Sequence, residues 1–182
     1  AAGNGTSLLI LYYKLIKYHS HEHIINNQLY ACDIDLICCR VLTKKLGLKN
    51  VYNVDYLTHD FKNMKFNIGI LNPPFQDITS DSTNTTSLDT QFIQKIYDMT
   101  SEYVVSISSA SWSSKSSNKF KNWILSLNQL ELFKDIPSKT FDIALPTCYF
   151  VINKNHNSKI TTVISNTGYK TYQNTSEQQN IF

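Results

Sequence analysis

The sequence predicts an α/β fold built on a mostly parallel sheet. Short apolar runs bounded by turn residues indicate buried strands, and between them lie segments in which apolar residues recur at helical spacing. Strands that alternate with helices form a doubly wound sheet with helices on its faces. The clearest strand is residues 66–71 (FNIGIL), which runs directly into Asn72-Pro73-Pro74-Phe75.

The bulk composition is that of a globular protein. The chain has 182 residues, of which 42% are hydrophobic and 17% are charged, enough for one domain with a sizeable core. The net charge of +3 permits a nucleic-acid partner without arguing for one, because the basic residues are spread along the sequence. No apolar run approaches the length of a membrane span, and no signal peptide is recognisable. We therefore expect a cytoplasmic protein that does not associate with membranes.

The four cysteines do not suggest a metal site. They are Cys32, Cys38, Cys39 and Cys148, and no pair has the spacing of zinc ligands. Free thiols in a reducing compartment are the expected state.

The N-terminal residues combine a glycine-rich turn with a predicted helix. Gly3 and Gly5 flank Asn4, just before a segment with helical apolar spacing at residues 7–18. A Gly-x-Gly turn at a helix N-terminus lets a ligand approach bare backbone and its free N–H groups, although many loops contain this pattern. The helix is apolar around much of its girth, so we expect it to be buried against the sheet.

The second predicted strand ends in acidic residues. Residues 28–32 (QLYAC) are followed by Asp33-Ile34-Asp35. A carboxylate at a strand end, about 20–30 residues past a Gly-rich turn, is where Rossmann-like folds bind ribose hydroxyls. The alternative is that either acid caps the next helix. We assign Asp33 to the ribose and Asp35 to the cap, with the helix ending near Gly47.

A third short strand is predicted at residues 51–54 and is followed by Asp55-Tyr56. An aspartate with a neighbouring aromatic ring at a strand end could bind the amino group of an adenine and flank its ring. The alternative is an ordinary turn aspartate.

The Asn72-Pro73-Pro74-Phe75 segment forms a stiff corner at the end of the predicted central strand. The two prolines fix their φ angles and lack N–H donors, and the residue before each proline is forced out of the α region. At this edge of an open α/β sheet ligands commonly bind. An amide, unpaired carbonyls and a ring in fixed positions suit the binding of a planar group with an exocyclic amine. The alternative is a turn beside a core phenylalanine.

The remaining elements follow the same alternation. Residues 76–90 are polar and predict a long loop at the ligand edge. Helices are expected at 89–100 and 119–127, and strands at 103–107, 130–133, 148–152 and 160–164. The strands near 130–133 and 148–152 are expected to form an antiparallel pair at the sheet edge.

The order of these signals resembles the S-adenosylmethionine-dependent amino-methyltransferases, most closely the DNA adenine-N6 methyltransferases of restriction-modification systems. The resemblance covers roughly residues 1–153. It implies a Rossmann-like class I methyltransferase sheet, mostly parallel with an antiparallel edge strand. It also implies a catalytic domain over residues 1–153 and a polar C-terminal extension over residues 154–182.

The resemblance further implies site residues and a mechanism. The implied S-adenosylmethionine-binding residues are Ala2, Gly3, Asn4, Gly5, Asp33, Ile34, Asp55, Tyr56 and Asn72. The implied catalytic residues are Asn72, Pro73, Pro74 and Phe75. The target adenine would be rotated out of DNA and stacked on Phe75. Asn72 and the Pro73 carbonyl would accept hydrogen bonds from its amine, and no metal would be needed.

The sequence departs from the family pattern in two places. The strand and the acid-Pro part that precede the Gly-x-Gly turn are not seen, so we expect the first strand of the sheet to be missing. A DNA-reading domain is also not seen, which implies that a specificity domain or subunit supplies sequence recognition. The remaining alternatives are an RNA guanine-N2 or protein glutamine methyltransferase, and a catalytically inactive fragment that serves as a binding module.

Overall fold

The computed structural model describes residues 2–74, 87–114, 119–137, 140–141, 145–156, 160–165 and 168–173. The chain divides into two compact units, residues 1–61 and residues 62–182. They are called the N-terminal unit and the C-terminal unit below.

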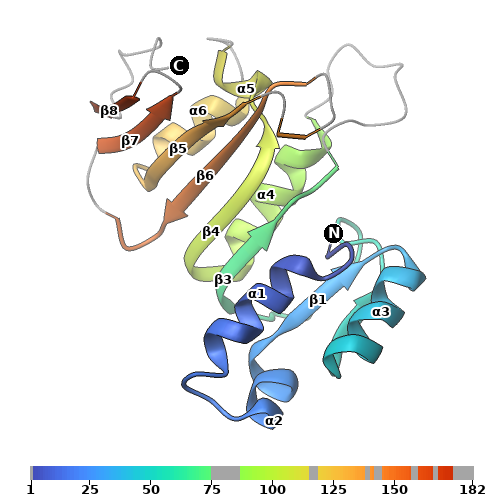
Figure 1. The fold of residues 1–182 in the computed structure, drawn as a ribbon. Coiled ribbons are helices and arrows are strands. Elements are labelled where there is room, and N and C mark those ends of the chain that lie inside the picture. Colours follow the sequence, from blue (N-terminus) through green and yellow to red (C-terminus); the bar gives the residue numbers. More distant parts are fainter. Residues whose placement is uncertain are drawn as a thin grey trace. The chain divides into compact units, whose positions relative to one another are not determined.

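The N-terminal unit contains a two-stranded parallel sheet with helices packed on it (Figure 1). Its elements are α1 (Thr6–Leu15), α2 (His21–His23), a π-helical turn (Ile24–Gln28), β1 (Tyr30–Asp33), α3 (Leu36–Leu46) and β2 (Asn50–Asn53). The strands pair from Tyr30 opposite Asn50 to Asp33 opposite Asn53. Because the strands are parallel, their carboxyl ends lie at the same edge of the sheet.

One stripe of α1 packs on the core of this unit, and the other stripe is exposed. Leu8, Leu11, Tyr12 and Leu15 contact a buried cluster made of Ile24, Leu29, Ala31, Leu42 and Leu48. On the other stripe, Ile10 is 54% exposed and Tyr13 is 61% exposed. The expectation that the whole helix is buried was wrong, because only one side of α1 faces the buried cluster.

The termini of α3 follow the sequence prediction. Asp35 is the N-cap residue, and its Oδ1 accepts a hydrogen bond from the backbone N–H of Ile37 at 2.7 Å. Gly47 is the C-cap residue in the left-handed conformation, with φ of 65°. A glycine adopts this conformation without the strain that a Cβ would bring.

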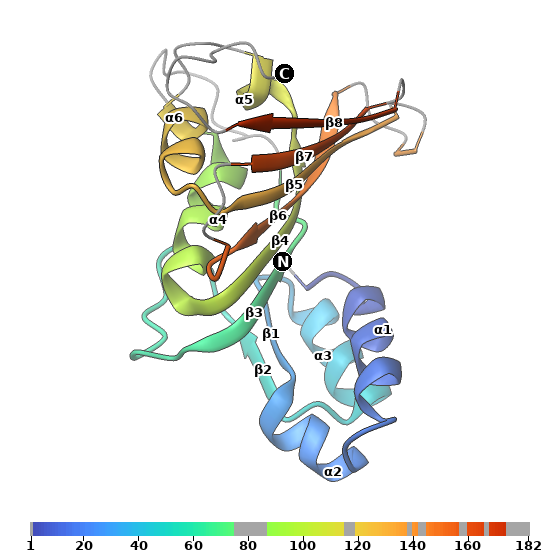
Figure 2. The ribbon, with the colours of Figure 1, turned by 90° about the vertical axis from the view of Figure 1, so that its left-hand side faces the viewer.

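The C-terminal unit contains a six-stranded sheet in the order β3-β4-β6-β5-β7-β8. Its strands are β3 (Phe66–Leu71), β4 (Thr100–Ser109), β5 (Leu130–Ile136), β6 (Thr147–Asn153), β7 (Ile160–Ser165) and β8 (Gly168–Gln173). Its helices are α4 (Leu88–Met99), α5 (Ser111–Ser114) and α6 (Lys119–Ser126). Figure 2 shows α4 and α6 on the same side of this sheet.

Four of the six strands run in one direction, which confirms a mostly parallel α/β sheet. β3 is parallel to β4, and β5 is parallel to β7. β6 is antiparallel to both β4 and β5, so those four strands share one direction, and β8 is antiparallel to β7. The predicted antiparallel pair of β5 and β6 is present. Its position differs from the prediction, because β6 lies inside the sheet between β4 and β5 and only β8 is an antiparallel edge strand.

The residues after Asn153 contribute more to the sheet than their polarity suggests. The expected strand at residues 160–164 is present as β7, and β8 pairs with it. The sequence of β8 is GYKTYQ, which has no aliphatic residue. An edge strand needs only one bonded side and little burial, so its residues give a weak apolar pattern.

Lys154 connects the end of β6 to the end of α4. Its Nζ donates hydrogen bonds to the backbone oxygens of Tyr97 at 2.6 Å and Thr100 at 2.7 Å. The same ammonium group lies 3.8 Å from the centroid of the Tyr97 ring. A cation at a helix C-terminus satisfies carbonyl groups that have no partner within the helix.

We expect Lys154→Met to lower the free energy of unfolding by about 1–2 kcal/mol, because it removes both bonds and keeps the apolar stem. Urea unfolding followed by circular dichroism measures this loss. Lys134→Met, at an exposed lysine of β5, is the matched control and should change stability little. Equal stability of the two variants would contradict this role of Lys154.

The four cysteines are free thiols, as the sequence predicted. Cys148 is completely buried, and its Sγ lies 3.4 Å from the Ser108 hydroxyl. Burial raises the pKa of the Cys148 thiol to about 12, so almost no reactive thiolate exists at neutral pH.

We expect Cys148 to remain unmodified when the native protein is treated with iodoacetamide at pH 8. Cys38 is partly exposed and should be alkylated under the same conditions, although burial also raises the pKa of its thiol. Peptide mass spectrometry measures both sites. Alkylation of Cys148 as fast as in urea would show that this part of the core opens readily.

Candidate functional site

The glycine-rich turn and the first strand end are joined through Asp33. The backbone N–H of Gly3 donates to Asp33 Oδ2 at 2.9 Å, and the N–H of Asp35 donates to Asp33 Oδ1 at 2.9 Å. The backbone N–H of Ala2 also donates to the Cys32 oxygen at 3.1 Å. Asp33 is only 7% exposed, so its carboxylate is held firmly between the turn and β1. Each oxygen keeps a further lone pair that could accept a ligand hydroxyl.

The two glycines of the turn are required for different reasons. Both have positive φ angles, 55° at Gly3 and 83° at Gly5. A Cβ at Gly5 would overlap the Leu42 side chain, so this glycine lets α1 and α3 approach closely. A Cβ at Gly3 would meet no atom within 4 Å, so the backbone there faces open space. Asn4 stabilises the start of α1, because its Oδ1 accepts hydrogen bonds from the N–H and the hydroxyl of Thr6.

Asn53 is a residue of this site that the sequence reasoning missed. Its side-chain nitrogen donates to the backbone oxygens of Asp33 at 3.1 Å and Ile34 at 2.9 Å. Asn53 thus fixes the end of β1 from the neighbouring strand β2. This contact is possible because the parallel register places Asn53 opposite Asp33. The residues next to Asn53 in the sequence do not indicate this contact.

An exposed apolar surface lies next to Asp33. Ile34 is 74% exposed and Ile37 is 70% exposed. Apolar side chains with that much exposure beside a buried carboxylate suit a ligand that has a ring and a hydroxylated sugar. Together with the open backbone at Gly3, these residues fit an adenosyl group.

Asp55 and Tyr56 form a compact turn. The Asp55 carboxylate accepts hydrogen bonds from the N–H of Leu57 at 2.9 Å and from the hydroxyl of Thr58 at 3.1 Å. Tyr56 is 8% exposed, and its ring centroid lies 5.6 Å from that of Phe61. Asp55 therefore forms the ordinary turn that was the alternative interpretation of this residue. The exposed carboxylate retains acceptor capacity for a ligand, whereas the Tyr56 ring packs in the core of its unit.

The Asn72-Pro73-Pro74 segment follows β3 in the C-terminal unit. β3 ends at Leu71, which is the last residue of its parallel register with β4 and lies opposite Ser106. Asn72 and Pro74 are exposed and Pro73 is buried. Asn72 is therefore an exposed residue directly after β3, at the carboxyl end of the strand, and its role in the site stays a prediction. Phe75 lies outside the described residues.

A polar network at the same edge was not predicted from the sequence. Asp89, at the start of α4, is completely buried and accepts a hydrogen bond from the N–H of Ser109 at 3.0 Å. The Ser109 hydroxyl lies 2.8 Å from that of Ser111. Trp112 donates from its Nε1 to the Ser108 hydroxyl at 3.3 Å. These contacts order the residues at the end of β4, the strand next to β3.

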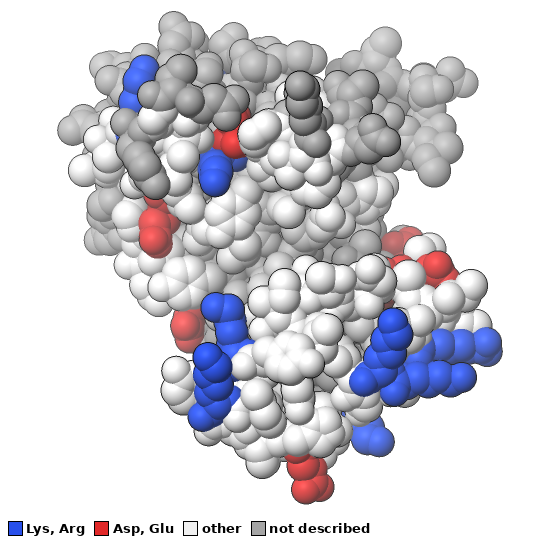
Figure 3. Space-filling view, in the orientation of Figure 1, with Lys and Arg blue, Asp and Glu red and all other residues white. Residues whose placement is uncertain are grey.

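The described residues contain no group of three or more histidine, cysteine or acidic side chains suited to hold a metal ion. None of the helices in the described part of the chain is long and apolar enough to cross a membrane. Figure 3 shows the described lysine and arginine side chains of the visible face in separate groups.

Comparison with known proteins finds one family model that matches most of the chain. A model of the family described as Eco57I restriction-modification methylase matches residues 6–141. That range includes Asp33, Asp55 and the Asn72-Pro73-Pro74-Phe75 segment. None of the curated proteins matches the sequence.

Solved structures of methyltransferases share the fold. The EcoKI M protein, a type I restriction enzyme subunit, has 14% identity and a TM-score of 0.70, over 91% of this chain and 42% of its own. A structure from Listeria monocytogenes assigned to the class I S-adenosylmethionine-dependent methyltransferases has 13% identity and a TM-score of 0.71, over 91% and 56%. A type I restriction-modification methyltransferase subunit from Streptococcus thermophilus has 12% identity and a TM-score of 0.63, over 76% and 36%. The chain thus spans little more than half, or less, of the length of these structures, and the similarity concerns the fold.

Proposed function

Because the chain belongs to the Eco57I restriction-modification methylase family, we propose that it transfers a methyl group from S-adenosylmethionine to the N6 amine of an adenine in DNA. The single observation that carries this proposal is the position of Asn72. Asn72 is an exposed residue directly after β3, at the carboxyl edge of the sheet, and two prolines restrict the backbone that follows.

In this proposal the cofactor is held by the N-terminal unit. The backbone from Ala2 to Gly5 accommodates the methionine part, and the Asp33 carboxylate accepts hydrogen bonds from the ribose hydroxyls. Ile34 contacts the adenine ring, and Asp55 binds its amino group. The fit is supported by the open backbone at Gly3 and by the exposed side chain of Ile34. When bound, S-adenosylmethionine supplies an electrophilic methyl group on a sulfonium ion.

The C-terminal unit supplies the residues that act on the acceptor. The side-chain oxygen of Asn72 and the carbonyl oxygen of Pro73 accept hydrogen bonds from the adenine amine. These bonds favour a tetrahedral nitrogen with a localised lone pair, which is a better nucleophile. Phe75 stacks on the base after its rotation out of the duplex. Catalysis then rests on orientation and on hydrogen bonds that strengthen as the reaction proceeds.

DNA is the proposed partner, and sequence recognition is assigned to a further domain or a partner subunit. The boundary between a catalytic domain over residues 1–153 and an extension over residues 154–182 remains part of the proposal. A cytoplasmic location is likewise proposed.

A methylation assay with labelled S-adenosylmethionine and three acceptors tests the proposed function. The acceptors are duplex DNA, ribosomal RNA and a release factor. We expect label in DNA alone, and Asn72→Ala protein serves as the negative control. Label in RNA or in the release factor instead of DNA would indicate one of the related amine methyltransferases. If no acceptor is labelled and calorimetry detects no binding of S-adenosylmethionine, the chain is an inactive binding module.

A further inference from the structure

Asp89 is a buried carboxylate for which the proposed reaction has no direct use. It lies in the first turn of α4 and is 0% exposed, and this burial raises the pKa of its carboxyl group. Burying a carboxylate is unfavourable unless its oxygens are well hydrogen-bonded. The groups that bind its two oxygens therefore indicate what the residue does.

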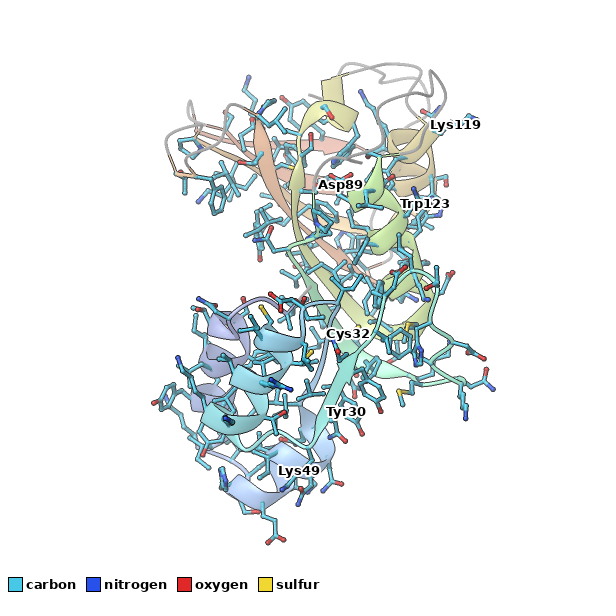
Figure 4. All side chains as sticks on the ribbon, turned by 90° about the vertical axis from the view of Figure 1, so that its right-hand side faces the viewer. Tyr30, Cys32, Lys49, Asp89, Lys119 and Trp123 are labelled. Carbon is cyan, nitrogen blue, oxygen red and sulfur yellow. The ribbon has the colours of Figure 1, made fainter. Side chains whose placement is uncertain are left out.

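The two oxygens of Asp89 bind different parts of the C-terminal unit. Oδ1 accepts hydrogen bonds from the Ser87 hydroxyl at 2.6 Å and from the Thr90 N–H at 2.9 Å, both at the start of α4. Oδ2 accepts the backbone N–H of Ser109, the last residue of β4, at 3.0 Å. Figure 4 shows Asp89 at the end of α4 that lies beside the end of β4. One side chain thus joins a helix start to a strand end.

The strand end that Asp89 holds lies beside the acceptor segment. β3 and β4 are parallel neighbours, and their register ends with Leu71 opposite Ser106. Asn72 therefore emerges from β3 beside the end of β4, where residues 107–109 extend beyond the register with β3 and still pair with β6. Ala110 is fixed next, because its N–H donates to the Pro146 oxygen at 2.8 Å.

We propose that Asp89 is a positioning residue for methyl transfer: by tying Ser109 to the start of α4 it fixes the end of β4 against the edge where Asn72 emerges. This inference rests on the proposed function, since it assigns the acceptor role to Asn72. A displacement of about 1 Å in an acceptor site lowers turnover by up to about 100-fold. Fixing the end of β4 beside Asn72 should therefore increase kcat.

Asp89→Asn tests the inference with little change in volume. An amide has one acceptor oxygen, so if that oxygen faces Ser87 and Thr90, its NH₂ group faces the Ser109 N–H and the bond is lost. We expect kcat for DNA methylation to fall about 10-fold or more, with the Kd for S-adenosylmethionine unchanged. Amide exchange measured by NMR should show the Ser109 N–H losing protection.

Two further variants separate positioning from stability. Ser87→Ala removes a donor from Oδ1 and leaves the Ser109 bond, so it should keep kcat and Ser109 protection even where the protein is less stable. Asp98→Asn changes an exposed carboxylate on the same helix and should alter nothing.

The outcomes distinguish this inference from the proposed function. Wild-type kcat in an Asp89→Asn protein whose Ser109 N–H has lost its protection, or an unprotected Ser109 N–H in the wild-type protein, would overturn the inference while leaving the proposed function intact. Equal losses of kcat in Asp89→Asn and Ser87→Ala would show that Asp89 stabilises the fold and does not specifically position the end of β4. A wild-type protein that binds S-adenosylmethionine and methylates no DNA would contradict the proposed function, and with it the role of Asp89 in turnover.

Discussion

Replacing Asn72 with alanine should abolish methyl transfer while leaving the affinity for S-adenosylmethionine nearly unchanged. The substitution removes the side-chain oxygen that is proposed to accept a hydrogen bond from the adenine amine. Loss of one such pre-positioned group typically lowers kcat by about 10²–10³-fold, and here the amine also loses its orientation. Asn72 is exposed and follows the last residue of β3, so the fold should tolerate the change.

Single-turnover methylation measures the effect on chemistry, and isothermal calorimetry measures cofactor binding. Asn122→Ala, at an exposed position of α6, is the matched control and should retain full turnover. If Asn72→Ala lost cofactor binding together with turnover, Asn72 would belong to the cofactor site alone. Retention of turnover would remove Asn72 from the reaction.

Replacing Asp33 with alanine should weaken the binding of S-adenosylmethionine by at least about 10-fold, through two effects that act together. The carboxylate is lost as an acceptor for the ribose hydroxyls. The N–H of Gly3 loses the bond that holds the glycine-rich turn against the end of β1. A bond to a charged acceptor is stronger than one between neutral groups, which is why this loss should be large.

Asp35→Asn is a closely matched control for Asp33→Ala. Asp35 lies two residues from Asp33, and its replacement removes the same negative charge. Asparagine is as good an N-cap residue as aspartate, so the bond to Ile37 and the start of α3 should persist. Calorimetry should find its cofactor affinity within a factor of about two of wild type. Similar losses in both variants would mean that net charge at this strand end, and not the Asp33 contacts, decides affinity.

The parts of the fold that were predicted well are those with a strong local pattern. Residues 66–71 form a strand with the predicted boundaries, and α3 begins and ends at the predicted Asp35 cap and Gly47. These features depend on nearest neighbours in the sequence, through apolar runs, side-chain caps and a glycine conformation. The alternation of helices and strands then sufficed for the α/β class.

The parts that were missed depend on partners distant in the sequence. β8 gains its strand conformation from pairing with β7, and β6 lies between two strands that precede it in the chain. The residues of β6 and β8 do not indicate which strand each will pair with. The exposed stripe of α1 was predicted as buried, since its apolar spacing does not reveal how much surface is available to cover it.

The same distinction holds for the site. Asp33 and Asn72 were recognisable because each lies at the end of an apolar run. Asn53 and Asp89 act through contacts to Asp33, Ile34 and Ser109, which are about 20 residues away, and an isolated asparagine or aspartate in a sequence gives no sign of them. Their roles follow from the parallel register of β1 with β2 and from the packing of α4 on β4.

The most direct test of the central claim is the identity of the methylated nucleoside. DNA treated with the protein and S-adenosylmethionine is digested to nucleosides and separated by liquid chromatography with mass spectrometry. The proposed roles of Asn72, Pro73 and Phe75 predict N6-methyldeoxyadenosine, which is absent when Asn72→Ala protein is used. A methylated cytosine in its place, or methylation of RNA or protein with none in DNA, would contradict the account.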